Sequence, residues 1–226
     1  MKNQETPAEQ TTSMSHPTQT IKSPYDYAAA LDTVTATGKC LYGPRFSIAD
    51  EDRPLILKLL CWFLMDEAKA EHEGINLQKG LLLLGPVGCG KTAIMNIMRR
   101  ICDPQRAFLL RPTTQIALEF AGEGYDVIHR YTSRSFNMHT HQPRTVCFDD
   151  LGFEGNVPWY GTICNSVAEI LLLRYDLFME HGMITHATTN LDSSGLEERY
   201  GNRIRSRMRQ MFNLIAFPQT GTDKRT

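Results

Sequence analysis

The sequence has few of the features that mark secreted proteins, membrane proteins and small domains held together by disulfides or metal ions. Its six cysteines contain no C-x-x-C pair, and several of them lie in apolar surroundings, which is typical of reduced thiols packed as small hydrophobic side chains. The longest apolar run, Leu59–Met65, is far too short to span a bilayer, and the polar residues after Met1 contain no secretory core. The net charge of −1 predicts no particular partner. We therefore expect a cytoplasmic protein that does not cross a membrane.

The composition changes along the chain and suggests three regions. Residues 1–22 are rich in Thr, Gln, Ser and Pro and have little to bury, so we expect a disordered tail. Residues 23–74 are predicted to form an N-terminal arm with turn-prone pieces over 25–49. A helix is expected from just after Asp50 to about His72, with Pro54 near its start. Residues 75–226 are predicted to be the core domain.

Short apolar segments alternate with helical patterns through this core. The strand candidates are Gly80–Leu84, Ala107–Arg111, Thr145–Phe148, Met183–Thr188 and Asn213–Phe217. The helix candidates are Lys91–Cys102, Thr113–Gly122, Thr162–His181 and Leu196–Met211. This alternation predicts an α/β fold, a parallel sheet with helices on both faces.

The segment GPVGCGKT, residues 85–92, fits the pattern G-x-x-x-x-G-K-[ST] between a buried strand and a helix. A polyphosphate needs several backbone N–H groups pointing inward, and glycines allow the close approach and unusual φ values of such a loop. The following helix adds its unpaired N–H groups and positive dipole end. We expect Lys91 to neutralise β- and γ-phosphate oxygens and Thr92 to ligate Mg²⁺. The residues predicted to bind ATP are Gly85, Pro86, Val87, Gly88, Cys89, Gly90, Lys91, Thr92 and Ala93.

Two further strands end in polar side chains. TVCFDDLG ends in Asp149, predicted to hold Mg²⁺, and Asp150, predicted to polarise the attacking water. Asp150 is one methylene shorter than the glutamate usual there in ATPases, so we expect slow hydrolysis. MITHATTNLD ends in Asn190, whose amide could reach the γ-phosphate or its water. Alternatively, Asn190 and Asp192 start a turn and cap the next helix, for which Ser194-x-x-Glu197 resembles a capping box.

The segment LEERYGNRIRSRMRQMF carries an arginine at every second position from Arg203 to Arg209. On a helix, Arg203 and Arg207 share one face, and Arg205 and Arg209 share another. A solvated basic helix is one interpretation. Beside an ATP site, the pattern also suggests an arginine supplied to the γ-phosphate of a neighbouring subunit.

Residues 126–145 interleave Arg130, Arg134 and Arg144 with Tyr131 and Phe136. Basic groups with stackable rings suit single-stranded DNA, although a surface loop has the same pattern.

Two other features have simpler interpretations. His139-x-His141 lacks a third ligand at a suitable spacing, so we expect a solvated loop there rather than a metal site. The rings of Trp159 and Tyr160 are expected to pack.

The order of GPVGCGKT, TVCFDDLG, ATTNL, ERYGNRIRSRM and TDKR over residues 75–226 resembles the AAA+ ATPases. More narrowly, it resembles the branch of helicase loaders (DnaC and DnaI) and the transposition helper IstB. The resemblance implies a five-stranded parallel sheet in the order 5-1-4-3-2 and a sensor role for Asn190. It also implies that Arg207 is a trans-acting arginine finger in a homo-oligomer, and that Arg225 is a second sensor. The resemblance also implies that residues 126–145 face the centre of a ring, which favours single-stranded DNA as their ligand.

The sequence thus predicts a slowly hydrolysing, Mg²⁺-dependent ATPase of DNA replication or remodelling, which engages single-stranded DNA and a protein partner. That partner is a replicative helicase for a loader and a transposase for an IstB-like helper. A P-loop kinase of small molecules and a non-enzymatic, ATP-gated adaptor are the alternatives.

Overall fold

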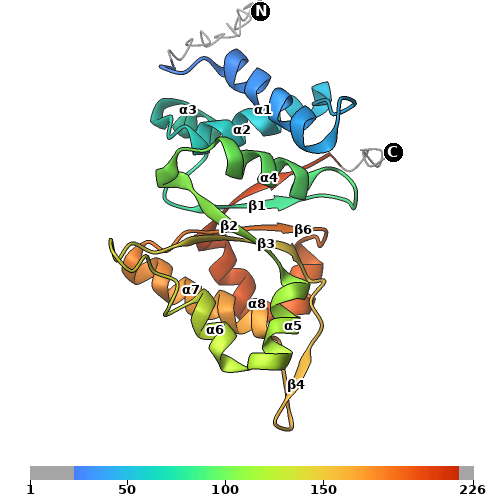
Figure 1. Ribbon diagram of the computed structural model, residues 1–226, viewed down its shortest axis with the longest axis vertical. Coiled ribbons are helices and arrows are strands. Elements are labelled where there is room, and N and C mark those ends of the chain that lie inside the picture. The colour runs from blue at the N-terminus through green and yellow to red at the C-terminus, as the bar shows by residue number, and fades with distance from the viewer. Residues whose placement is uncertain (1–22, 219–226) are drawn as a thin grey trace, which may run out of the picture.

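The computed structural model describes residues 23–218 of the chain. A central sheet separates α1–α4 on one face from α5–α8 on the other (Figure 1). The helices are α1 (Tyr27–Tyr42), α2 (Arg53–Phe63), α3 (Glu67–Glu73), α4 (Lys91–Ile101), α5 (Thr113–Glu123), α6 (Tyr125–Tyr131), α7 (Ser166–His181) and α8 (Ser193–Met211), with 3-10 turns at Asp50–Asp52 and Pro104–Arg106. The strands are β1 (Gly80–Leu84), β2 (Phe108–Pro112), β3 (Thr145–Leu151), β4 (Val157–Trp159), β5 (Thr162–Cys164), β6 (Thr185–Thr189) and β7 (Phe212–Ala216).

The five-stranded sheet has the order β2-β3-β6-β1-β7 with every pair parallel. Numbered among the core strands alone, this is the predicted order 5-1-4-3-2, so the fold prediction is confirmed. Because β6 lies between β3 and β1, the carboxyl ends of these three strands meet at one edge of the sheet. Parallel strands with both faces covered read as continuous apolar runs, as Leu81–Leu84 does.

The side chains of β1 contribute to two hydrophobic cores, one on each face of the sheet. Leu81 and Leu83, both 0% exposed, pack with α2 and α4, whereas Leu82 packs with α7 and α8. The first of these cores also contains Val34 of α1 and Ala70 of α3, so the N-terminal helices are packed against the sheet domain.

The N-terminal arm is more helical than predicted. The Asp26 carboxylate accepts from the backbone N–H groups of Ala28 and Ala29, both at 3.0 Å, and starts α1, which ends at Gly43 with φ of 96°. The single helix expected over 50–72 is divided. Met65 adopts φ of 57°, and the Asp66 carboxylate accepts from the Lys69 N–H at 3.1 Å to start α3.

The helix expected over 162–181 was wrong at its start. Residues Thr162–Cys164 form β5, and the Asn165 side chain accepts from the Ala168 N–H at 3.0 Å, which places the beginning of α7 at Ser166. Strands β4 and β5 form a hairpin that projects from the body (Figure 1). Trp159 packs on Phe120 as expected, with ring centroids 5.6 Å apart, but Tyr160 at the hairpin tip is 93% exposed.

Helix α8 is capped at its N-terminus by Asp192. The Asp192 carboxylate accepts from the Gly195 N–H at 2.8 Å and is the N-cap. Ser194 lies inside the helix, so the predicted capping box is wrong, whereas the predicted cap at Asp192 is confirmed. Over the described residues, no helix is long and apolar enough to cross a membrane.

Candidate nucleotide site

The loop between β1 and α4 has the backbone of a phosphate cradle. Gly88 and Gly90 have φ of 82° and 99°, values at which a side chain would be strained. Gly85 is required for a different reason. A Cβ there would lie 2.7 Å from Phe217 Cβ and 2.9 Å from Cys89 Sγ. Another residue at these positions would strain the loop, which leaves the N-terminus of α4 facing the site.

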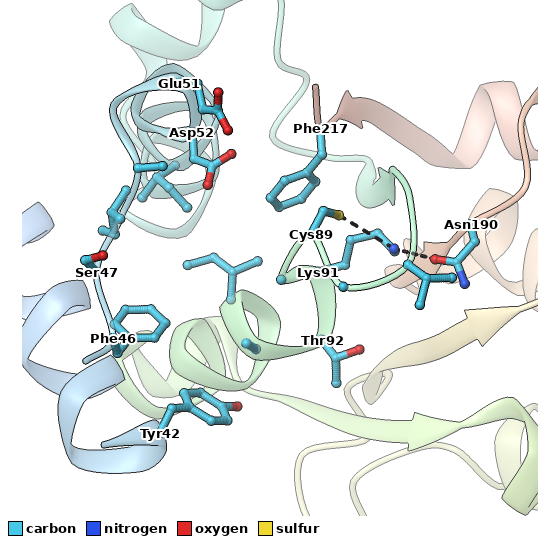
Figure 2. Close-up of a pocket in the computed structure, with 18 of the residues that line it drawn as sticks. Tyr42, Phe46, Ser47, Glu51, Asp52, Cys89, Lys91, Thr92, Asn190 and Phe217 are labelled. Carbon is cyan, nitrogen blue, oxygen red and sulfur yellow. Dashed lines mark hydrogen bonds between the residues drawn. The ribbon is translucent and has the colours of Figure 1, made fainter. Parts of the chain in front are cut away.

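Lys91 reaches back across this loop. Its ammonium donates to the carbonyl oxygens of Gly85 and Pro86, both at 2.9 Å. It also donates to Oδ1 of Asn190 (Figure 2). Lys91 is buried, with 4% of its surface exposed, and its ammonium, which has three N–H donors, is bonded to these three oxygens. The structure thus brings the predicted lysine of β1–α4 together with the predicted amide at the end of β6.

Thr92 and Asp149 form the second pair of predicted groups in contact. The Thr92 hydroxyl donates to Asp149 Oδ1 at 3.0 Å, and the Thr188 hydroxyl donates to the same oxygen at 2.6 Å. The pKa of the Asp149 carboxyl is raised above its usual value, mainly by burial and also by the neighbouring Asp150. The two hydroxyl bonds and the charge of Lys91 offset part of this rise. The sequence did not identify Thr188 as the residue that orients this carboxylate.

A hydroxyl beside a carboxylate at the mouth of a phosphate loop is a donor set that Mg²⁺ accepts, because Mg²⁺ prefers few protein oxygens together with substrate phosphates. Among residues 23–218, no three His, Cys, Asp or Glu side chains gather into a metal site. That His139 and His141 belong to a solvated loop rather than to a metal centre stays a prediction.

Asp150 is held in an unusual backbone conformation. Its φ of 58° coincides with a register shift in β3 between Phe148 and Leu151, a bulge that turns the chain at this point. The Asp150 N–H donates to the Thr188 hydroxyl at 2.9 Å, and its carbonyl accepts from the Thr113 hydroxyl at 2.7 Å. These bonds use only the backbone of Asp150, and the residue lines the cavity.

The cavity has a volume of about 1140 Å³ and is large enough for a nucleoside triphosphate. The phosphate loop, α4, Asp149, Asp150 and Asn190 line one side. The opposite wall is the N-terminal arm from Tyr42 to Asp52, whereas Phe217, which follows β7, lies beside the phosphate loop (Figure 2). The Asn96 amide of α4 donates to the Tyr42 hydroxyl at 3.0 Å and so ties the arm to the loop side. Sequence reasoning missed this wall, because YGPRF indicates a turn and does not indicate what the turn faces.

Arg207 lies outside the cavity and contacts its own chain. Its guanidinium donates to the Leu172 carbonyl at 3.3 Å, lies 3.5 Å from the Asp176 carboxylate and is 4.6 Å from the centroid of the Tyr175 ring. Arg203 is exposed and makes no hydrogen bond or ion pair within residues 23–218. Arg225, the predicted second sensor, lies outside the described residues.

The segment over 126–145 differs from a groove with stacking rings. Tyr131 is 4% exposed and donates to Glu119, so its ring is not available to a base. Phe136 packs edge-on against His181, with centroids 5.6 Å apart. Arg130 pairs with Glu119 and Glu123, and Arg134 pairs with Asp126 at 3.2 Å. Of the predicted basic groups, Arg144 alone is exposed without an ion pair within the described part of the chain.

No family model and no curated protein matches the sequence. Solved structures are similar to it in fold. The DnaC helicase loader is 17% identical with a TM-score of 0.52, over 76% of this chain and 93% of that chain. DnaI is 21% identical with a TM-score of 0.50, over 80% and 88%. AMPPCP-bound DnaA from Aquifex aeolicus is 15% identical with a TM-score of 0.51, over 76% of this chain and 48% of DnaA. The chain therefore has the α/β fold of the AAA+ P-loop proteins.

Proposed function

We propose that this protein is a Mg²⁺-dependent ATPase that acts in DNA replication or remodelling in the manner of a helicase loader. The observation that carries the proposal is the convergence of Lys91, Thr92, Asp149 and Asn190 at one edge of the sheet, facing one cavity. The AAA+ fold supports nucleotide binding, and the likeness to DnaC and DnaI supports a role in replication.

The residues of the chain divide the work of phosphoryl transfer. Backbone N–H groups of residues 85–90 and the Lys91 ammonium bind the β- and γ-phosphate oxygens, and Thr92 and Asp149 hold Mg²⁺. When bound, the ion neutralises charge that develops on those oxygens. Asp150 orients the attacking water, and its short side chain makes hydrolysis slow. When ATP binds, the hydrogen bond between Lys91 and Asn190 breaks, and the Asn190 amide contacts the γ-phosphate.

The cavity contains no arginine of α8, so charge stabilisation by that helix requires a second copy of the chain. We retain Arg207 as the trans arginine, in a homo-oligomer whose active site lies between subunits. Asp176 is 55% exposed and lies 3.5 Å away, and exposed pairs of this kind contribute only about 0–1 kcal/mol. To reach a neighbour's γ-phosphate, Arg207 would give up this weak ion pair together with its contacts to the Leu172 carbonyl and the Tyr175 ring.

Single-stranded DNA and a protein partner complete the proposal. Arg144 is the basic group of 126–145 best placed to contact a DNA phosphate, and contacts to phosphates need no stacking ring. A replicative helicase is the partner expected of a loader, and a transposase is the partner of an IstB-like helper. The cytoplasmic location remains a prediction.

The experiment that tests the proposal is ATP hydrolysis by the purified protein with and without Mg²⁺, compared with Lys91→Met. We expect slow, metal-dependent release of phosphate by the wild type and none above background by the variant. A substrate phosphorylated in place of water, with no phosphate release, would favour the kinase alternative.

A further inference from the structure

Glu154 is a buried carboxylate just beyond the proposed catalytic strand. Its side chain is 0% exposed, and it lies between Asp150 of β3 and the β4–β5 hairpin. A buried carboxylate is costly unless several groups satisfy it at once, so its position in the fold requires an explanation from its contacts.

The carboxylate joins its own loop to the start of α7 and to α8. Oε2 accepts from the backbone N–H of Gly152 at 2.9 Å. Oε1 accepts from the Tyr200 hydroxyl at 2.6 Å and from the Asn165 amide at 3.4 Å. Arg199 Nε lies 3.5 Å from Oε1, and the same guanidinium donates to the Glu154 carbonyl.

Two of these partner segments, the loop at Gly152 and the helix α8, have a role in the proposed site. Gly152, with φ of 98°, continues the bulged backbone that orients Asp150. Phe153 follows Gly152 and directly precedes Glu154. Its N–H donates to the Asp150 carbonyl at 3.2 Å, and the residue lines the nucleotide cavity. The Glu154 carboxylate is therefore bonded directly to the loop that fixes the catalytic carboxylate.

The other end of the network lies at a break in α8. Arg199 and Tyr200 directly precede Gly201, whose φ of 80° interrupts the helix. The part of α8 beyond this break carries Arg203 and Arg207. Burial and the neighbouring Glu154 raise the pKa of the Tyr200 hydroxyl, so Tyr200 remains a donor to Glu154. A shift of the Asp150 loop that moved Glu154 would leave a buried charge unsatisfied unless the first part of α8 moved with it.

We propose that Glu154 is a positioning residue that couples the loop behind Asp150 to the arginine helix α8 of the same chain. Through this carboxylate, the state of one nucleotide site sets the orientation of the arginines that the subunit presents to its neighbour. The inference rests on the proposed function, because it assigns a role to α8 in trans.

The test is Glu154→Gln, which keeps the size of the side chain and one acceptor oxygen but removes the charge. We expect a nucleotide Kd within about twofold of wild type, a kcat lowered about tenfold, and a higher protein concentration for half-maximal ATPase rate. Tyr200→Phe, which removes one donor and keeps the ring, should change the same quantities in the same direction. It serves as the second variant if the Gln variant does not fold.

Glu119→Gln is a matched control. Glu119 also accepts from a tyrosine hydroxyl, that of Tyr131, and pairs with an arginine, Arg130, but it lies on α5, apart from the nucleotide cavity. Its kcat and its concentration dependence should equal those of wild type.

The outcomes separate this inference from the proposed function. A wild-type protein without ATPase activity contradicts the proposed function itself. An active wild type whose Glu154→Gln and Tyr200→Phe variants keep both kcat and the half-maximal concentration contradicts the role of Glu154. Equal losses of nucleotide binding and of turnover, matched by a loss of folded protein, would also overturn it, because a purely structural residue gives that result.

Discussion

Replacing Asp150 by asparagine removes one charge from the site and leaves its surroundings unchanged. The bonds to Thr188 and Thr113 are made by the Asp150 backbone N–H and carbonyl, not by its side chain. Asparagine also tolerates the left-handed conformation, φ of 58°, that this residue adopts. We therefore expect the variant to fold with wild-type stability.

The magnitude follows from what the carboxylate does. Orienting and polarising the attacking water contributes about 10²–10⁴-fold to such reactions. Because Asp150 is short and hydrolysis is expected to be slow, we predict the lower limit, a fall in kcat of about 100-fold, or about 2.7 kcal/mol. Asp150→Glu restores the usual length and should raise kcat above wild type. Asp150→Ala is less informative, since alanine in this conformation costs about 1 kcal/mol of stability.

The assay is single-turnover hydrolysis of ATP, with the nucleotide Kd measured in parallel by fluorescence. Asp150→Asn should bind nucleotide as wild type does and turn it over about 100-fold more slowly. If its rate of hydrolysis stays within about twofold of wild type while binding is unchanged, Asp150 does not act on the water. The role assigned to the bulge in β3 would then be refuted.

Two other predictions concern α8 and the core. Arg207→Ala should keep nucleotide binding and lower the ATPase rate at high protein concentration by about 1,000-fold. Arg209 is exposed, and Arg209→Ala should leave this rate unchanged. A loss of ATPase rate caused by Arg203→Ala and not by Arg207→Ala would contradict the assignment. Burial, with lesser contributions from Arg106 and Arg174, lowers the pKa of His186 from 6.5 to about 3. The unfolded chain therefore binds an extra proton between these pH values, and the free energy of unfolding should fall by about 2 kcal/mol from pH 7 to pH 5. Chemical denaturation should show a shallower pH dependence for His186→Gln, and an unchanged slope would exclude this cause.

The sheet could be predicted because local patterns determine it. An apolar run such as Leu81–Leu84, ended by glycines and followed by a helix, has few alternatives, and the strand order followed from a resemblance carried by the same motifs. The phosphate loop and the polar residues that end β3 and β6 were located for the same reason, since the carboxyl ends of parallel strands converge.

Long-range packing could not be predicted in this way. The arm that forms one wall of the cavity contains no motif, and its position depends on contacts such as that between Tyr42 and Asn96, which are distant in sequence. Tyr131 resembled a stacking ring until burial on α6 placed it in the core. The role of Glu154 is visible only when α8 is folded beside β3, because no spacing in the sequence links Glu154 to Tyr200.

The central claim is that the loop over residues 85–92 holds a triphosphate through its backbone and Lys91. Its most direct test is the titration of purified protein with a fluorescent ATP analogue in the presence of Mg²⁺, for wild type and Lys91→Met. We predict saturable binding to the wild type and at least about tenfold weaker binding to the variant, because one charge-assisted contact of about 1.5–3 kcal/mol is lost. A wild type that does not bind the analogue, or a variant that binds it equally well, would contradict the account.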